Sequence, residues 1–275
     1  MDILIPFLVI LAIALTAGAL LLLFSYLFAV KKDPTEEKIR ACLPGINCGA
    51  CGYKGCDDYA ATLAKGDVKN PALCIPGAQK AADEISAILG VESVTFEDVV
   101  AYVHCNGHCD ATPAVASYEG VSSCRGAAML YGGTDACRFS CLGLGDCAAV
   151  CPSDAICLRD GIAHVDTSRC LGCGLCAQAC PKHVISMLPQ YSAVAVMCSN
   201  KEKGADARKA CKNACIACKK CEKTCPNGAI TVENNLAVID YSKCTKCGAC
   251  ADACPTACLK HTAFPNLPEN FTIGK

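Results

Sequence analysis

The sequence predicts an α+β protein with one membrane-spanning helix followed by several small, cysteine-rich units. Three observations predict this. An uncharged stretch longer than a bilayer requires opens the chain. Of the 275 residues, 28 are cysteine and none is tryptophan, and aromatic residues make up 5%. One cysteine pattern recurs along the second half of the chain. This composition favours small units tied together by metal clusters over one large hydrophobic core.

The amino-terminal segment is the predicted membrane span. Residues 3–30 carry no charged side chain, and about 20 apolar residues are enough to cross a bilayer. The competing interpretation is a cleaved signal peptide, which would have a shorter apolar region, a basic start where Asp2 stands and a small-residue cleavage site. Lys31 and Lys32 follow the span, and basic residues favour the cytoplasmic side. We therefore predict a single-pass protein of the cell (inner) membrane, with its cysteine-rich body on the cytoplasmic side.

One module occurs twice. Residues 151–170 and 225–244 have the same length, begin with Cys-Pro, share an Ala-Ile pair and end with Asp-x3-Cys. Alternating apolar residues flank a two-residue turn, at 160–161 in the first copy and at 234–235 in the second, so each copy is predicted to form a short hairpin. Cys157 has no cysteine counterpart in the second copy, and we predict that it is a strand residue and not a ligand.

The cysteines of each module have the spacing of two-cluster bacterial ferredoxins. In that pattern three closely spaced thiolates hold one [4Fe–4S] cluster, and the fourth, followed by proline, binds the neighbouring cluster. Three runs are regular, and the run that begins at Cys137 is stretched but rich in glycine. The crossing rule predicts four clusters, held by Cys137, Cys141, Cys147 and Cys180; by Cys170, Cys173, Cys176 and Cys151; by Cys215, Cys218, Cys221 and Cys254; and by Cys244, Cys247, Cys250 and Cys225.

A fifth cluster is predicted nearer the membrane. Its candidate ligands are Cys48, Cys51, Cys56 and Cys74. The glycine-rich loop around the first three lets the backbone wrap closely and aim its amides at cluster sulfurs. Helices are expected over 57–65 and 78–89, with a helix start at Asp33 and Pro34 before the loop. The alternative is a structural zinc site.

Three more cysteines could belong to a sixth cluster. Cys105, Cys109 and Cys124 would supply three ligands, and Cys198 or Cys211 the fourth. The alternative is that they are ordinary buried thiols. Iron per chain separates the two, with about 24 expected for six clusters and about 20 for five. Cys258 is expected to be packed and not to bind metal, and Cys42 remains unassigned.

Two other kinds of cysteine-rich protein fit the pattern less well. A secreted disulfide scaffold would have cysteines suited to pairwise bridges, whereas these are crowded three in a row and followed by Cys-Pro. Zinc ribbons use two separated cysteine pairs, which leaves the third closely spaced cysteine of each run unexplained.

The charge distribution has one basic segment. The formal net charge is −1, and five oxidised clusters would take it to roughly −11. Against this, residues 199–225 contain eight basic and three acidic side chains. One interpretation is local compensation of cluster charge, and the other is a docking patch for a small acidic electron carrier. Nucleic acid is disfavoured because stacking aromatic residues are missing. The basic residues are Lys201, Lys203, Arg208, Lys209, Lys212, Lys219, Lys220 and Lys223.

The sequence contains no site for completing a reaction. It has no Gly-x-Gly-x-x-Gly after a strand and no Walker A motif, and we identify no catalytic residue. A membrane-anchored electron carrier of this kind implies partners that supply the donor and the acceptor. The predicted division is 1–30 transmembrane helix, 31–91 helical 4Fe–4S domain, 92–131 connector, 132–190 first ferredoxin-like module, 191–206 connector, 207–264 second ferredoxin-like module and 265–275 tail.

The order of these parts resembles the B subunit of the Rnf ion-translocating electron-transport complex, in a long form with two tandem two-cluster modules. The resemblance depends most on the Cys48 to Cys74 domain joined to a membrane helix. It implies an electron relay that takes electrons from reduced ferredoxin and passes them to flavin- and NAD-binding subunits and multi-span membrane subunits of a ferredoxin:NAD+ oxidoreductase that translocates Na+ or H+. The chain would then be enzymatic only as a subunit of that translocase.

Two alternatives remain open. One is a membrane-tethered polyferredoxin that delivers electrons to a hydrogenase or a sensor-reducing system, and the other is a non-redox structural metal protein. Co-purifying subunits would distinguish the first alternative from the Rnf function, and a reducible brown chromophore would exclude the second.

Overall fold

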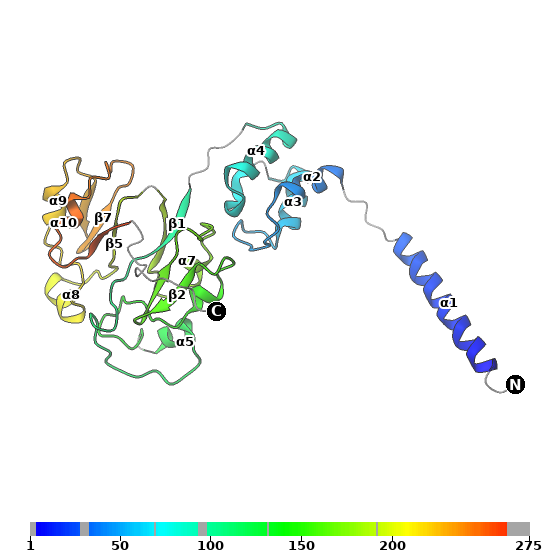
Figure 1. Ribbon diagram of the computed structural model, residues 1–275, viewed down its shortest axis with the longest axis horizontal. Helices are drawn as coiled ribbons and strands as arrows, with labels where there is room; N and C mark the ends of the chain where they lie inside the picture. The colour runs from blue at the N-terminus through cyan, green and yellow to red at the C-terminus, as the bar shows by residue number, and fades with distance from the viewer. Residues whose placement is uncertain are drawn as a thin grey trace.

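The computed structural model describes residues 4–27, 33–68, 70–92, 98–130, 132–190 and 192–262. Helix α1 (Leu4–Leu27) forms the amino-terminal end of the chain in Figure 1. Its 24 residues span about 36 Å at 1.5 Å per residue, against about 30 Å of bilayer hydrocarbon. Residues Leu8–Tyr26 have a mean hydropathy of 2.7, and none of them is buried. By length and composition α1 can cross a membrane. Lys31 and Lys32, on which the predicted orientation depends, lie outside the described residues.

A small helical domain follows. Its helices are α2 (Pro34–Cys42), α3 (Cys56–Lys65) and α4 (Ala78–Leu89), with the short 3-10 turns η1 (Pro71–Leu73) and η2 (Ile75–Gly77) between α3 and α4. The predicted start of α2 is confirmed, because the side chain of Asp33 accepts a hydrogen bond of 2.8 Å from the Thr35 amide. The helices predicted for α3 and α4 are confirmed as well. The apolar faces of α2, α3 and α4 meet over Ile39, Tyr59 and Ile85, each of which is at most 1% exposed.

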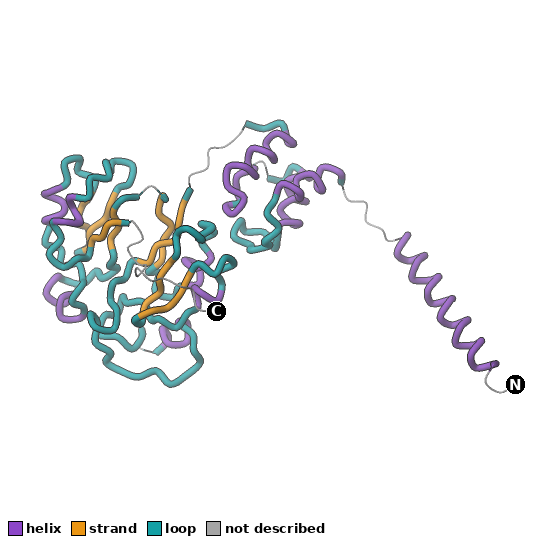
Figure 2. The backbone as a smooth tube through the Cα atoms, in the orientation of Figure 1, coloured by secondary structure: helices purple, strands orange, loops and turns teal. Residues whose placement is uncertain are grey.

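The first ferredoxin-like module contains two antiparallel strand pairs (Figures 1 and 2). Strands β2 (Ile156–Arg159) and β3 (Ile162–Val165) form the predicted hairpin, with Cys157 in β2. Strand β4 (Ile185–Pro189) pairs with β1 (Val99–Val103). The predicted connector 92–131 therefore supplies a strand to this module, and also helix α5 (Cys124–Met129). Helices α6 (Asp146–Ala149) and α7 (Leu175–Ala179) complete the module.

The second module repeats this arrangement. Strands β6 (Ile230–Glu233) and β7 (Leu236–Ile239) form the second predicted hairpin. Strand β5 (Val194–Val196), within the predicted connector 191–206, pairs with β8 (Leu259–His261) as β1 pairs with β4. Helices α8 (Gly204–Ala210), α9 (Lys220–Thr224) and α10 (Ala249–Asp252) lie beside these strands. In both modules, the strand that follows the last cysteine run pairs with a strand that precedes the module.

Candidate metal-cluster sites

The helical domain gathers the four predicted cysteines around one cavity. Site 1 consists of Cys48, Cys51, Cys56 and Cys74, which line about 330 Å³ of space not filled by atoms. Burial, with a smaller contribution from the other three thiols, raises the pKa of the Cys74 thiol to about 11. Asn47 fixes the loop, because its side-chain oxygen accepts a hydrogen bond of 2.8 Å from the Cys56 amide. Four converging thiols around a cavity with an otherwise mostly apolar lining fit a [4Fe–4S] cluster.

The crossing arrangement also occurs in the regular runs of the two modules. Burial raises the pKa of Cys176 to about 12 and that of Cys221 to about 11, and burial also raises the pKa of Cys250. In each case the neighbouring thiols that contribute to the raised pKa are the other three of the predicted set. We name site 2 as Cys151, Cys170, Cys173 and Cys176, site 5 as Cys215, Cys218, Cys221 and Cys254, and site 6 as Cys225, Cys244, Cys247 and Cys250.

Backbone amides point at the ligand sulfurs of these sites. The Ala155 amide donates to Cys151 Sγ at 3.3 Å, and the equivalent Ala229 amide donates to Cys225 Sγ at 3.3 Å. Such hydrogen bonds stabilise negative charge on a thiolate ligand. The four thiols of site 5 line a cavity of about 330 Å³, as in site 1.

The stretched run gathers a different set from the predicted one. Burial, together with the nearby Cys141, Cys124, Cys176 and Cys180 thiols, raises the pKa of Cys147 to about 12. The Cys141 thiol likewise has Cys124 and Cys180 as neighbours. Cys137 is not among these neighbours. We name site 3 as Cys124, Cys141, Cys147 and Cys180. Cys124, at the start of α5, takes the place of the middle cysteine that the stretched loop lacks.

Asp146 holds Cys124 at site 3. Its carboxylate accepts hydrogen bonds from the Cys124 amide at 2.9 Å, the Arg125 amide at 3.0 Å and the Ser123 hydroxyl at 3.0 Å. Burial acts to raise the pKa of the Asp146 carboxyl, but these hydrogen bonds outweigh burial and hold the pKa below its usual value. One carboxylate thus joins the start of α5 to the start of α6, and each helix carries a candidate ligand of site 3.

Replacing Asp146 with alanine is expected to loosen site 3. Loss of three hydrogen bonds to one carboxylate is expected to cost about 1–3 kcal/mol locally, so an iron chelator should remove iron from site 3 faster than from the other sites. Bleaching of the visible absorbance under anaerobic chelation measures this. Glu119→Ala, an exposed carboxylate in the segment that leads to α5, is the matched control. Equal bleaching rates for the two variants would contradict the role given to Asp146.

Cys137 lies at a further site between the two modules. Site 4 consists of Cys105, Cys137, Cys198 and Cys211, which line a cavity of about 280 Å³. Burial raises the pKa of Cys137, and the Cys198 and Cys211 thiols raise it further. Burial raises the pKa of Cys105 to about 12, with Cys137 among the thiols that add to the effect. The structure thus brings together three of the candidates for the possible sixth cluster, Cys105, Cys198 and Cys211, and adds Cys137 to them.

Polar groups around site 4 fit a sulfur-rich ligand. The Asn200 side chain, fully buried, donates from Nδ2 to Cys137 Sγ at 3.5 Å. A Cβ on Gly107 would lie 3.4 Å from Cys105 Sγ and 2.8 Å from Thr112 Oγ1. That buried hydroxyl has no hydrogen-bond partner among the described residues. Only glycine leaves this space open, and a cluster sulfur beside the hydroxyl would give it an acceptor.

Site 4 has internal symmetry, because each module contributes two equivalent cysteines. Cys105 follows β1 and Cys198 follows β5, each two residues after its strand. Cys137 and Cys211 each precede the next cysteine of their run by four residues. The hydrogen bonds repeat as well, since the Cys141 amide donates to Cys105 Sγ at 3.4 Å and the Cys215 amide donates to Cys198 Sγ at 3.4 Å. The shared Cys-x3-Cys spacing is the sequence signal that could have identified this site.

The remaining cysteines lie outside these six sets. Cys109, predicted as a candidate ligand of the sixth cluster, is exposed and does not line site 4. Cys42 donates a hydrogen bond of 3.3 Å to the Lys38 carbonyl oxygen within α2. Cys258 is 1% exposed, which confirms that it is packed.

Models of three iron–sulfur families match the chain. They describe a putative Fe–S cluster over residues 43–76, a 4Fe–4S binding domain over 163–186 and a 4Fe–4S dicluster domain over 214–258. The first model spans site 1, and the third contains every ligand of sites 5 and 6. Site 4 lies outside all three matched ranges.

Curated relatives match over most of the chain. The B subunit of the Na+-translocating ferredoxin:NAD+ oxidoreductase complex of Acetobacterium woodii is 43% identical over 233 residues, which cover 84% of this chain and 70% of the relative. The chain belongs to the RnfB family. The B subunit of the proton-translocating complex of Clostridium ljungdahlii is 39% identical, over 90% of this chain and 88% of the relative. The B subunit of an ion-translocating oxidoreductase complex from Methanosarcina acetivorans is 38% identical, over 88% of this chain and 92% of the relative.

Membership of the RnfB family, together with the 4Fe–4S domains, identifies the chain as an iron–sulfur electron relay subunit of a membrane-associated oxidoreductase complex. The expected fold class is confirmed by the mixed helices and strands, the apolar amino-terminal helix and the two ferredoxin-type matches. This member of the RnfB family also has a basic surface and an open groove outside its cysteine sites.

The basic segment flanks the exposed edge of site 5. Cys218 is exposed, and the neighbouring Lys219, Lys220 and Lys223 are exposed at the start and along the side of α9. Lys219 Nζ lies 3.9 Å from the buried Glu222 Oε2 atom, at the outer limit of an ion pair, and its side chain is otherwise exposed. The positive charge of these lysines is therefore available to a partner that approaches site 5.

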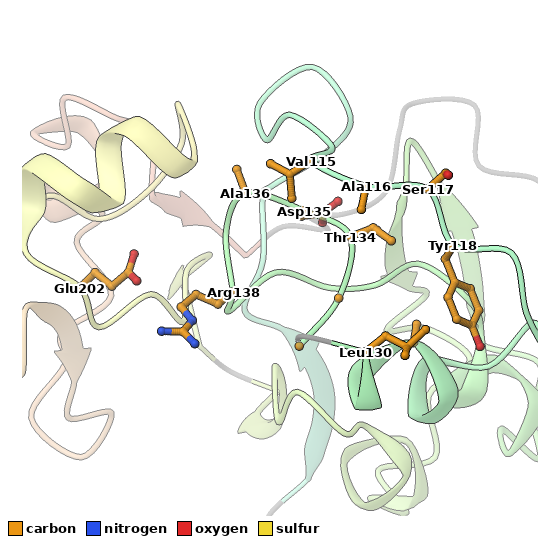
Figure 3. Close-up of a pocket in the computed structure, with 13 residues that line it drawn as sticks. Val115, Ala116, Ser117, Tyr118, Leu130, Thr134, Asp135, Ala136, Arg138 and Glu202 are labelled. Atoms are coloured by element: carbon orange, nitrogen blue, oxygen red, sulfur yellow. The ribbon is translucent and has the colours of Figure 1, made fainter.

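A groove of about 600 Å³ lies beside α5 (Figure 3). Tyr118 and Leu130 border one end of it, and Arg138 and Glu202 lie toward the other (Figure 3). None of the described residues that line it is a cysteine or a histidine. The groove is therefore separate from the candidate cluster sites.

Proposed function

We propose that this chain accepts electrons from reduced ferredoxin and passes them, one at a time, through six [4Fe–4S] clusters to partner subunits. The partners are flavin- and NAD-binding subunits and multi-span membrane subunits, and the complex reduces NAD+ while it translocates Na+ or H+. The names of the relatives support this, since they describe Na+- and proton-translocating ferredoxin:NAD+ oxidoreductases. What supports the proposal most is that each proposed cysteine site has cysteines of the next site as neighbours.

The series begins where the helical domain meets the first module. Cys48 of site 1 is close enough to Cys173 of site 2 to contribute to the raised pKa of the Cys173 thiol. Gly172 lies in the site 2 loop, and Ile75 directly follows the site 1 ligand Cys74. A Cβ atom added at Gly172 would lie 3.4 Å from the Ile75 side chain. Site 2 adjoins site 3, because the Cys176 thiol of site 2 contributes to the raised pKa of Cys147 in site 3. Sites 1 and 2, and sites 2 and 3, are therefore neighbours.

Site 4 links the two modules. The amide of the site 3 ligand Cys141 donates to Cys105 of site 4, and the amide of the site 5 ligand Cys215 donates to Cys198 of site 4. Sites 5 and 6 are joined through the run that holds Cys221 and Cys225. We therefore propose the electron path from site 5 through sites 4, 3 and 2 to site 1, with site 6 exchanging electrons with site 5. A cluster at each site would supply the one-electron redox chemistry, and the protein residues hold it and hydrogen-bond to its sulfurs.

Electron entry is proposed at site 5, where the exposed lysines surround Cys218. Ferredoxins that carry reduced clusters are acidic, and opposite charge raises encounter rates. Changing Lys219, Lys220 and Lys223 to glutamate is expected to slow ferredoxin-dependent reduction of the chain about 10-fold or more at low salt. Stopped-flow absorbance at several ionic strengths measures this.

The matched control for the entry patch is a charge reversal elsewhere. Lys38, Lys65 and Lys80 are exposed on the helical domain, and changing them to glutamate alters the net charge equally. The control should keep the wild-type rate and salt dependence. If the entry variant also keeps them, ferredoxin docks elsewhere and the basic segment only compensates cluster charge.

Anaerobic purification of the intact complex tests the function as a whole. We expect multi-span and flavin-carrying subunits to co-purify and ferredoxin-dependent NAD+ reduction to occur, with the visible absorbance of this chain bleaching on reduction. Co-purification with a hydrogenase in place of these subunits would contradict the proposal. Protease digestion of inside-out membrane vesicles tests the proposed cytoplasmic side, because the body should then be degraded.

A further inference from the structure

Cys258 and Val184 hold equivalent places in the two modules. Each follows the last cysteine of its module by four residues and is 1% exposed. The Cys258 carbonyl oxygen accepts a hydrogen bond of 2.7 Å from the Met197 amide, and the Val184 carbonyl oxygen accepts one of 2.6 Å from the His104 amide. Each backbone bond therefore fixes the residue beside a site 4 ligand, Cys198 in one module and Cys105 in the other.

The two positions differ in chemistry. The Cys258 side chain lines the site 5 cavity and packs in the same buried cluster as Cys198 of site 4 and Cys215 of site 5. Val184 packs in the same cluster as Cys105 of site 4 and Cys141 of site 3, but an isopropyl group has no proton to donate. The junction between sites 4 and 5 thus contains a buried thiol where the junction between sites 3 and 4 contains a hydrocarbon.

We propose that Cys258 is not a ligand but a positioning residue, whose S–H group donates to the ligand sulfurs of sites 4 and 5 and raises the reduction potential of at least one of them. Sites 4 and 5 each have four other cysteines, so Cys258 is not needed for coordination. A single thiol has one proton, so the two sulfurs share it. A hydrogen bond to a ligand sulfur stabilises the more negative, reduced cluster, and this raises the potential. The inference rests on the proposed function, because it requires clusters at both sites.

Three variants of the full complex, purified anaerobically, test the role of this thiol. Cys258→Val replaces it with the residue that the first module already accommodates, Cys258→Ser keeps a donor, and Val184→Cys introduces a donor at the opposite junction. Iron per chain and electron paramagnetic resonance during a redox titration are measured for each. We expect unchanged iron in all three and a shift of one or two centres to more negative potential in Cys258→Val. Cys258→Ser should restore the wild-type potential or exceed it, and Val184→Cys should shift a centre to more positive potential.

The outcomes separate this inference from the function on which it rests. Loss of about four iron atoms, or a three-iron signal, in Cys258→Val would show that Cys258 is a ligand and overturn the inference. Unchanged potentials in Cys258→Val, or equal shifts in the valine and serine variants, would reduce Cys258 to packing and overturn it as well. A wild-type chain with far fewer than about 24 iron atoms would instead overturn the six-cluster proposal.

Discussion

Changing Cys198 to alanine is expected to stop electrons between the two modules while leaving both modules reducible. Site 4 is the proposed link between sites 3 and 5, and Cys198 is one of its four candidate ligands. We expect the variant to lose up to about four iron atoms per chain. Ferredoxin should still reduce sites 5 and 6, and sites 1–3 should stay oxidised on the timescale of turnover. Rapid-freeze paramagnetic resonance after mixing with reduced ferredoxin measures which centres are reduced.

A second variant guards against local misfolding. Cys105 supplies site 4 from the other module, so Cys105→Ala should give the same electron block although it lies on the far side of the site. Cys157→Ala is the control, because Cys157 lies in β2 outside all six sites, and it should keep both iron content and electron transfer. Reduction of sites 1–3 at the wild-type rate in both site 4 variants would contradict the proposed path.

Removing the iron is expected to unfold the cysteine-rich body. The core of the second module includes five site 4 and site 5 cysteines, packed with alanine, valine and other small side chains. Without clusters these side chains lose their packing partner, and lost core volume destabilises a protein. Since a domain is typically stable by only about 5–15 kcal/mol, emptying both sites is expected to remove that margin.

Circular dichroism during anaerobic chelation measures this loss. The cooperative thermal transition should disappear and the strand signal should fall, because cluster binding and folding are coupled. The helical signal of α1 should remain in detergent, since the backbone hydrogen bonds of a membrane helix are satisfied within the helix. A transition at the same temperature with and without iron would contradict this prediction.

Local sequence signals predicted the elements of the fold. Both hairpins could be placed because their two-residue turns interrupt alternating apolar strands. Helices α3 and α4 could be placed from their composition, and the left-handed glycines Gly66 and Gly90 end them. Strand β1 was missed because its partner β4 lies more than 80 residues later, and a short apolar run in a connector gives no sign of a distant partner.

The same limit applies to the candidate sites. Ligand sets with regular spacing, such as site 6, could be predicted from the run itself. Site 3 takes Cys124 from α5, outside its module, and site 4 takes two cysteines from each module. Such sets depend on how segments far apart in the sequence come together. The equivalence of Cys137 and Cys211 was visible in the sequence, but it indicates a shared site only once β1 and β5 are known to be equivalent strands.

The most direct test of six linked clusters is to count iron and acid-labile sulfide in the anaerobically purified chain. We predict about 24 iron atoms and as many sulfides per chain, all in brown, reducible centres. A count of about 20 iron atoms and 20 sulfides would show that one of the six clusters is missing. If the missing cluster is the one at site 4, the proposed electron path between the modules would be contradicted. A colourless protein, or one that contains zinc instead of iron, would contradict the account.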